Sequence, residues 1–217
     1  MSEYTLDTQV YSVDVDTSGR WMPYSVFNLT QDLADLHAQQ LKLSRQDMIG
    51  KGVVWIIARA HLSMERYPSF GEKIVAKTFY GAPSRIGFDR YYSFHTAQEE
   101  LLGRMVALWL LGDVHTHKFV SPKSIGMEFP EQELDQRLLI PTNKLVFDGA
   151  ITAETVREPV YSDFDINRHV NNARYVQWVC DMFPLERFEN ASLKRLEMNY
   201  NSEVMPGQNV KIQLCFR

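Results

Sequence analysis

The run Val53-Val54-Trp55-Ile56-Ile57-Ala58-Arg59 begins the part of the chain that decides the fold. It is rich in β-branched and aromatic residues, and it opens four strand candidates at about 53–65, 72–81, 86–96 and 101–116. Turn-forming residues separate the candidates, namely Tyr67-Pro68-Ser69-Phe70-Gly71, Pro83-Ser84 and Gln98-Glu99-Glu100. Four strands joined by such short turns predict an antiparallel meander.

A strand and a helix are predicted before this meander. Residues 4–15 alternate and contain β-branched side chains, and Pro23 stands where a first helical turn would start. Apolar residues then recur at helical spacing, at Val26, Leu29, Leu33 and Leu36. Gly50 and Gly52 close the segment. We expect this helix to pack on the sheet.

The same order of elements returns after a connector. Residues 120–150 carry Pro122, Pro130 and Pro141 among polar residues, which predicts little regular structure. A strand at about 152–160 follows, then a helix and strands near 192–204 and 208–216. The apolar face of this second helix consists of Val176, Val179, Cys180 and Phe183.

This repetition suggests an internal duplication. Residues 59–71 and 195–207 span the same distance, and alternating strand sequence follows both. We therefore predict an α+β protein in which a long helix packs on a curved antiparallel sheet twice, the arrangement called a double hot-dog. Two unrelated α+β halves remain the alternative.

The expected domains are an N-terminal hot-dog at 1–119, a connector at 120–150 and a C-terminal hot-dog at 151–217. The second half is short at its C-terminal end, because it lacks counterparts of the last two strands of the first half. Further chain or another subunit would have to cover that sheet edge, so a homodimer is possible.

Composition excludes several classes of protein. The 217 residues are 45 % hydrophobic with a net charge of -4, so no overall basic field favours nucleic acid. Cys180 and Cys215 alone cannot build a disulfide framework or a Cys-x-x-Cys metal site. The apolar runs are far below the ~20 residues that span a bilayer, and residues 1–4 show no signal peptide. We expect a cytoplasmic protein without a membrane span.

A dense polar motif lies between the strand and the helix of the second half, at residues 163–172. In an extended segment Asp165, Asn167 and His169 would point to one side, which would place a carboxylate, an amide and an imidazole in one cleft. Asn171 or Asn172 is the expected N-cap of the following helix, whose positive end would polarise a carbonyl. Such a site suits hydrolysis of a thioester.

The alternative is an Asx-rich turn that only caps the helix. The aligned position of the first half argues against it, because Trp21-Met22-Pro23 carries no acid, amide or imidazole there. A cap needed for folding would be expected to recur, whereas a catalytic site is needed once.

The motif also resembles a known family. The sequence Asp165-Ile166-Asn167-Arg168-His169-Val170-Asn171-Asn172, with Tyr175 and Trp178 after it, is similar to the signature of the acyl-acyl carrier protein thioesterases of plants and bacteria. Two first-half stretches, at 54–59 and 65–71, agree with that family. The likeness runs from about residue 4 to the C-terminus.

The resemblance implies hydrolysis of fatty acyl thioesters on an acyl carrier protein, without a cofactor or a metal. It implies that Asp165, Asn167, His169 and Glu203 are catalytic. The expected substrate-binding residues are Trp55 and Arg59 on the first-half strand and Asn171 and Asn172 at the helix start. Val204 occupies the position of a cysteine common in the family, so a water activated by Glu203 or His169 is the simpler nucleophile.

Other residues carry weaker expectations. Met22, Val26, Leu29, Leu33, Trp55, Ile57 and Trp109 would form an acyl slot or simply the core. A basic patch of Arg168, Arg174, Lys194 and Arg195 would meet an acidic carrier protein, although a scattered solvated face is the more common meaning. His61, His95, His115 and His117 lack the partners of a metal site.

Three other functions stay open: an acyl-coenzyme A thioesterase, a hot-dog hydratase or dehydratase, and a non-catalytic acyl-binding protein.

Overall fold

A computed structural model describes residues 3–116, 118–126, 138–147 and 149–215. One antiparallel sheet dominates it, with the strand order β1-β3-β4-β5-β2-β8 and β6 beside β5. The strands are β1 (Glu3–Gln9), β2 (Val53–Met64), β3 (Lys73–Pro83), β4 (Gly87–Thr96), β5 (Leu101–Asp113), β6 (Phe119–Val120) and β8 (Arg195–Asn199). The four strand candidates after residue 53 are thus confirmed, as β2 to β5. The predicted meander holds only for β3, β4 and β5, because β2 pairs with β5 and not with β3.

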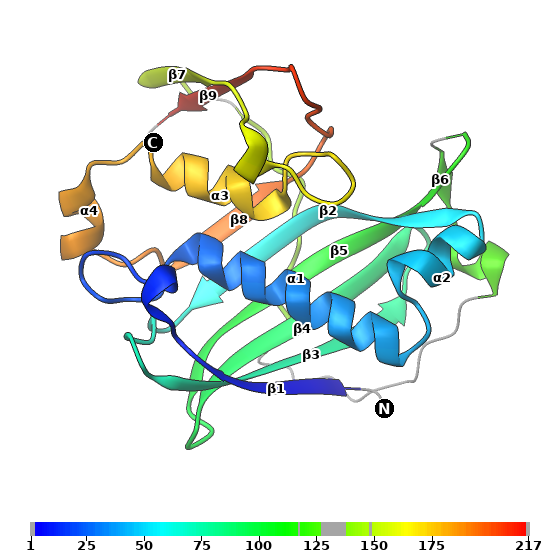
Figure 1. Cartoon of the computed structure of the whole chain (residues 1–217), viewed down its shortest axis with the longest axis horizontal. Helices are drawn as coiled ribbons and strands as arrows, with labels where there is room; N and C mark the ends of the chain where they lie inside the picture. Colours follow the sequence, from blue (N-terminus) through cyan, green and yellow to red (C-terminus); the bar gives the residue numbers. More distant parts are fainter. Residues whose placement is uncertain (1–2, 117, 127–137, 148, 216–217) are drawn as a thin grey trace.

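Helix α1 (Pro23–Gln40) lies across one face of this sheet (Figure 1). Pro23 occupies its first turn, where a missing N–H costs nothing. Val26 and Leu33 are fully buried, and Leu29 packs against the same core. Leu36, the fourth apolar residue at helical spacing, is 37 % exposed at the edge of this face. Val26 and Leu33 hold α1 on the sheet.

The predicted first-half helical segment is interrupted. Helix α1 ends at Gln40, Lys42 adopts a left-handed φ of 56°, and a second helix, α2 (Arg45–Gly50), begins after Ser44. Ser44 and Asp47 form a capping box, in which each side chain receives the other residue's backbone N–H. The break turns α2 away from α1 at the end of the sheet (Figure 1).

The second half contains β7 (Ala153–Arg157), α3 (Asn172–Cys180), α4 (Leu185–Asn190), β8 and β9 (Val210–Leu214). Its sheet is divided: β8 extends the large sheet beside β2, whereas β7 and β9 form a separate two-stranded sheet (Figure 1). Helix α3 has nine residues against eighteen in α1 and packs against α1. The predicted α+β fold of helices on antiparallel sheet is confirmed, and the second half is short, with a helix half as long as α1.

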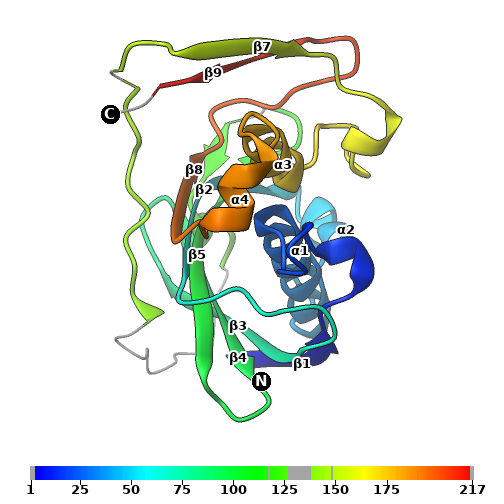
Figure 2. The same cartoon turned by 90° about the vertical axis from the view of Figure 1, so that its left-hand side faces the viewer.

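The segment leading into the second half lies on the sheet face opposite to α1 (Figure 2). Residues 139–147 contain no helix or strand, as the prolines predict, and η2 (Pro122–Ile125) is a single turn. Leu138 and Ile140 pack on the outer face against Phe79, Tyr91 and Val106. The part of the predicted connector at 127–137 lies outside the described residues.

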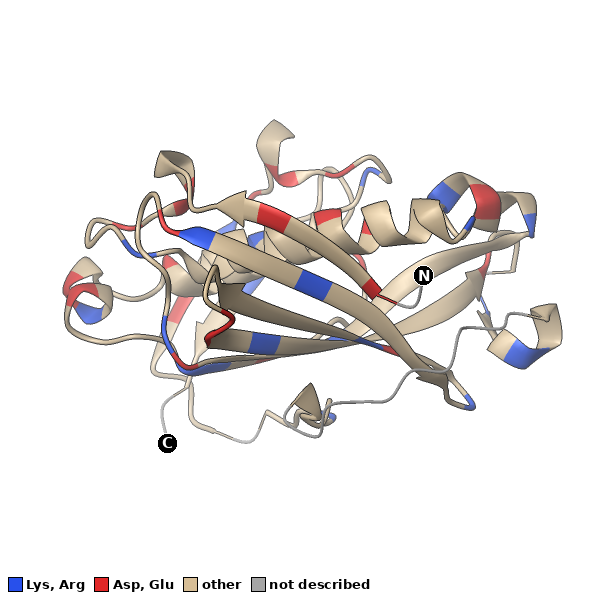
Figure 3. Cartoon of the chain, turned by 90° about the horizontal axis from the view of Figure 1, so that it is seen from below, with Lys and Arg blue, Asp and Glu red and all other residues tan. Residues whose placement is uncertain are grey.

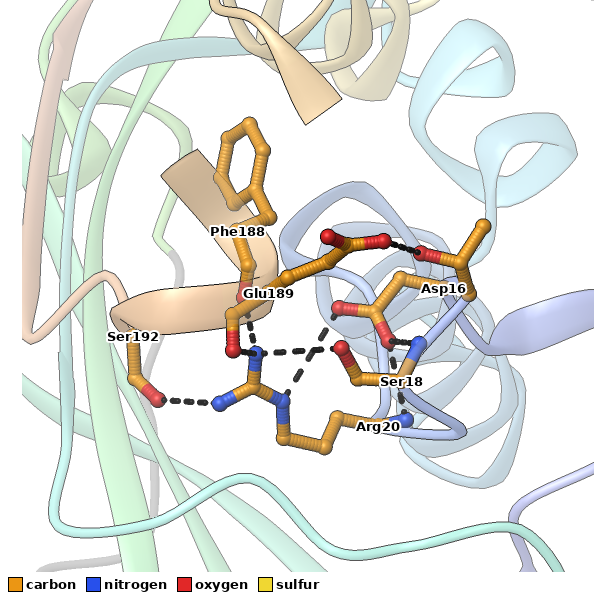
Figure 4. A network of polar contacts seen from close by, with 7 residues as sticks. Asp16, Ser18, Arg20, Phe188, Glu189 and Ser192 are labelled. Atoms are coloured by element: carbon orange, nitrogen blue, oxygen red, sulfur yellow. Dashed lines mark hydrogen bonds and ion pairs between the residues drawn. The ribbon is translucent and has the colours of Figure 1, made fainter. Parts of the chain in front are cut away.

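Arg20 lies just before the N-terminal end of α1 and joins the two halves of the chain (Figure 4). Its guanidinium donates to Ser192 Oγ at 3.1 Å and to the backbone carbonyls of Phe188 and Glu189 in the last turn of α4. Asp16 holds the Arg20 loop, since its carboxylate accepts from the Arg20 backbone N–H at 3.1 Å. The N-terminal loop therefore caps a helix of the second half.

None of the helices in the described residues is both long and apolar enough to cross a bilayer.

Candidate active site

The polar motif folds as a tight loop, not as the extended segment that we expected. Phe164 and Val170 pair as an isolated bridge, and the Asp165 backbone N–H donates to the His169 carbonyl at 2.9 Å. Arg168 has a left-handed φ of 64°, which reverses the chain between them. Because the backbone turns, alternation no longer decides where the three polar side chains point.

Asp165 is engaged with its own loop. Its Oδ1 accepts the backbone N–H groups of Asn167 at 2.8 Å and His169 at 3.3 Å. This is an Asx-type turn, in which the carboxylate replaces a backbone acceptor. Asp165 therefore shapes the loop that presents Asn167 and His169.

His169 and Glu203 come together across the fold. His169 Nε2 lies 3.4 Å from Glu203 Oε2, and Val170 N–H donates to the Val204 carbonyl at 3.0 Å beside them. The Glu203 side chain is 57 % exposed and that of His169 27 %, so water reaches the pair. Burial raises the pKa of the neighbouring Tyr175, and the negative charge of Glu203 raises it further. An imidazole, a carboxylate and a neutral phenol thus share one site.

Asn167 faces the first half of the chain. Its Oδ1 accepts from Nε of Arg45, the first residue of α2, at 2.7 Å. No local pattern in the sequence pointed to Arg45 as part of the site, because the contact joins residues 122 positions apart.

The N-terminus of α3 is capped as predicted, by Asn171. Its side-chain oxygen accepts the Ala173 N–H at 2.8 Å. The same amide forms a reciprocal pair with Gln31 of α1, with distances of 3.2 and 3.0 Å. Asn172 is the first residue of α3, and its carbonyl lies 3.4 Å from the Tyr200 hydroxyl. Gln31 is a second contact that the sequence did not reveal.

Trp55 and Arg59 lie on opposite faces of β2. Trp55 packs under α2, where its indole N–H donates to the Leu43 carbonyl at 2.9 Å. A β-bulge between Ile57 and Arg59 shifts the alternation, and Arg59 donates to the Thr142 carbonyl at 3.0 Å on the outer face. The structure therefore does not bring Arg59 together with His169.

Five other members of the expected acyl slot lie in or against the core. Val26, Leu33 and Ile57 belong to the main core, and Leu29 and Trp109 pack against it. A cleft of about 560 Å³ lies instead on the outer side of the motif loop, lined by Tyr161, Ser162, Phe164, Asp165, Ile166, Arg168 and Pro206. Neither Asn167 nor His169 is among the residues that line this cleft.

The remaining expectations concern thiols, metals and charges. Cys180 packs against the main core, and burial raises its pKa to about 12, so its thiol is protonated at neutral pH. In the described ranges, no three His, Cys, Asp or Glu side chains gather as metal ligands. His117, one of the four histidines considered, lies outside those ranges.

Two of the four residues of the expected basic patch, Lys194 and Arg195, lie away from the motif. Lys194 donates to the Glu65 carbonyl and Arg195 pairs with Ser63, at the end of β8 that lies away from Tyr200 and the motif. Acidic and basic residues are interspersed on the side of the molecule shown in Figure 3. Arg45, in contact with Asn167, is the cation that the structure adds to the site.

Comparison with known families covers both halves. The sequence profile of the acyl-ACP thioesterase N-terminal domain matches residues 2–124, and that of the acyl-ACP thioesterase C-terminal domain matches residues 150–215.

Curated relatives agree at low identity. A chloroplastic palmitoyl-acyl carrier protein thioesterase of Gossypium hirsutum is 28 % identical over 72 % of this chain and 40 % of its own length. A chloroplastic oleoyl-acyl carrier protein thioesterase of Coriandrum sativum is 26 % identical over 82 % of this chain and 53 % of its own. The chain thus spans about half the length of the curated relatives that it matches.

Two solved structures share the fold. An acyl-ACP thioesterase of Bacteroides thetaiotaomicron superposes with a TM-score of 0.83 at 23 % identity, over 96 % of this chain and 84 % of that one. The 12:0-ACP thioesterase of Umbellularia californica gives 0.84 at 22 %, over 98 % and 87 %.

Proposed function

Because the chain belongs to the acyl-ACP thioesterase family, we propose that it hydrolyses fatty acyl thioesters of acyl carrier protein to the free fatty acid and the carrier thiol. The observation that carries this proposal is the 3.4 Å contact between His169 and Glu203. Two elements distant in sequence bring a potential base and its partner to a solvent-accessible position beside Asn167 and the start of α3.

The proposed reaction uses water as the nucleophile. Glu203 or His169 removes a proton as the water oxygen bonds to the thioester carbonyl carbon. The carbonyl electron pair moves onto oxygen, where the Asn167 amide and the positive end of α3 stabilise the charge. When the oxyanion collapses, the C–S bond breaks, and the thiolate takes a proton from the protonated base.

No thiol is needed in this reaction. Val204 stands where a cysteine would follow Glu203, and Cys180 is held in the core as the protonated thiol. Asp165 supports the reaction through the loop, since its carboxylate holds the N–H groups of Asn167 and His169. The first half would bind the acyl chain, with Trp55 under α2 as one of its aromatic residues.

Mass spectrometry after incubation with a set of acyl carrier thioesters tests the proposal. We expect free fatty acid and unloaded carrier, whereas an altered acyl chain still attached would indicate a hydratase or dehydratase. An unchanged thioester would contradict enzymatic function. Acyl-coenzyme A substrates of matched chain length decide which carrier is preferred.

Two variants then test the base. His169→Ala and Glu203→Gln should each lower turnover by about two powers of ten, with Cys180→Ser as the control that stays near wild type. Full turnover in folded His169→Ala protein would overturn the site. The cytoplasmic location and the homodimer stay predictions.

A further inference from the structure

Arg45 makes an unusual contact for an exposed arginine at the start of a short helix. Its Nε donates to Asn167 Oδ1 at 2.7 Å, and among the described residues it takes part in no ion pair with a carboxylate. A cation in the first turn of a helix gains nothing from the helix dipole. Arg45 therefore contributes little to α2 itself, and its partner is the motif loop.

This contact determines which way the Asn167 amide points. A guanidinium has only donors, so the amide atom that meets it must be the oxygen. The two N–H bonds of Asn167 are then directed away from Arg45. The Asn167 backbone is fixed as well, because its N–H is held by Asp165 at 2.8 Å. Both ends of this residue are thus constrained.

The charge on Arg45 also strengthens the amide as a donor. A hydrogen bond from a cation to the amide oxygen draws electron density from the nitrogen, and linked hydrogen bonds polarise one another. An N–H donor fixed in place before the reaction is most effective where an oxyanion develops.

We propose that Arg45 is a positioning residue, which orients the Asn167 amide towards the thioester carbonyl and polarises it for the oxyanion. The inference rests on the proposed function, because it takes Asn167 as the donor to that carbonyl. It gives the first half of the chain a part in the chemistry besides holding the acyl group.

A different role for Arg45 would be electrostatic attraction of the acidic carrier protein. Lys51, at the other end of α2, provides a matched control, because Lys51→Ala removes the same charge from the same helix. A substrate with a small pantetheine thiol in place of the carrier protein separates the two roles, since it presents no acidic protein surface.

Kinetics of Arg45→Ala, Asn167→Ala and the double variant test the proposal. We expect Arg45→Ala to lower kcat about tenfold or more, with KM changed less than about twofold, for carrier and pantetheine substrates alike. Arg45→Lys should recover part of the loss. In the Asn167→Ala background, Arg45→Ala should have almost no further effect. Equal losses in both backgrounds, or a rise in KM confined to the carrier substrate, would overturn it.

A measurement without substrate separates this inference from the proposed function. The side-chain amide NMR signals of Asn167 should shift in Arg45→Ala and stay in place in Lys51→Ala. If these signals do not move, Arg45 does not position Asn167, whatever the enzyme hydrolyses. If they move in a protein that cleaves no thioester, the contact is real but the reaction assigned to the site is wrong.

Discussion

The carboxylate of Asp165 has a structural role in the motif loop, which variants can distinguish from a catalytic role. Its Oδ1 accepts two backbone N–H groups of the motif loop, a task that an amide oxygen also performs. We expect Asp165→Asn to keep turnover within about tenfold of wild type, whereas Asp165→Ala loses about a hundredfold because Asn167 and His169 are released. Steady-state kinetics of the two variants decides. If Asp165→Asn lowers turnover as much as Asp165→Ala does, the negative charge of Asp165 itself takes part in catalysis.

The residues of this site were easier to predict than their contacts. Asp165, Asn167 and His169 stand out by type and by resemblance, Glu203 by resemblance alone, and the Asn171 cap follows from local preference. The Arg45 and Gln31 contacts reach over 122 and 140 positions, where no short-range rule applies. The extended reading failed because Arg168 takes a left-handed conformation that an arginine rarely adopts.

At the level of elements, the cap on α4 is the contact to test. The Arg20 guanidinium reaches two carbonyls in the last turn of α4 and the Ser192 hydroxyl (Figure 4). Hydrogen bonds from a charged donor contribute about 1.5–3 kcal/mol, and partial exposure reduces that value here. We expect Arg20→Ala to lower the free energy of unfolding by about 1 kcal/mol and to speed hydrogen exchange of α4.

Urea unfolding and hydrogen exchange measure these two effects. Arg187→Ala is the control, because Arg187 is an exposed cation in the same helix. Equal behaviour of the two variants would mean that the Arg20 contacts add nothing in solution.

Elements were predictable where the pattern is local. Alternation and turn residues located β2 to β5, and Pro23 located the start of α1. The sequence before α2 contains the capping-box signature Ser44-x-x-Asp47. The segment up to Gly50 was nevertheless predicted as one helix. The pairing of β8 with β2 joins two halves of the chain, and no feature of either strand alone specifies it.

For the whole molecule, the burial of phenol and thiol groups predicts that the free energy of unfolding falls at alkaline pH. Burial raises the pKa of the Tyr67 and Tyr92 phenols far above the usual 10.0 and that of the Cys180 thiol from 9.0 to about 12. At a pH above these usual pKa values, the folded state therefore holds more protons than the unfolded state. The free energy of unfolding must then fall as pH rises, and it is unaffected by these groups below about pH 8.

Urea titrations between about pH 8 and pH 11 check this dependence. Tyr67→Phe removes one of the three groups, so its stability should fall less steeply with pH. It also loses the hydrogen bond to the Leu193 carbonyl, which lowers stability at every pH. Stability that stays constant up to pH 11 in the wild type would contradict the assigned burial.

The pairing of β8 with β2 also limits where insertions and deletions can be accepted. Arg59 faces Asn199 and Ser63 faces Arg195, so Leu196 and Met198 are directed to the core. One residue gained or lost within β8 would exchange its two faces. A two-residue slip would keep the faces but move the chain that leads to Glu203 by about 6–7 Å. Length variation among homologous genes should therefore be found in the loops around β8 and be absent from the strand itself.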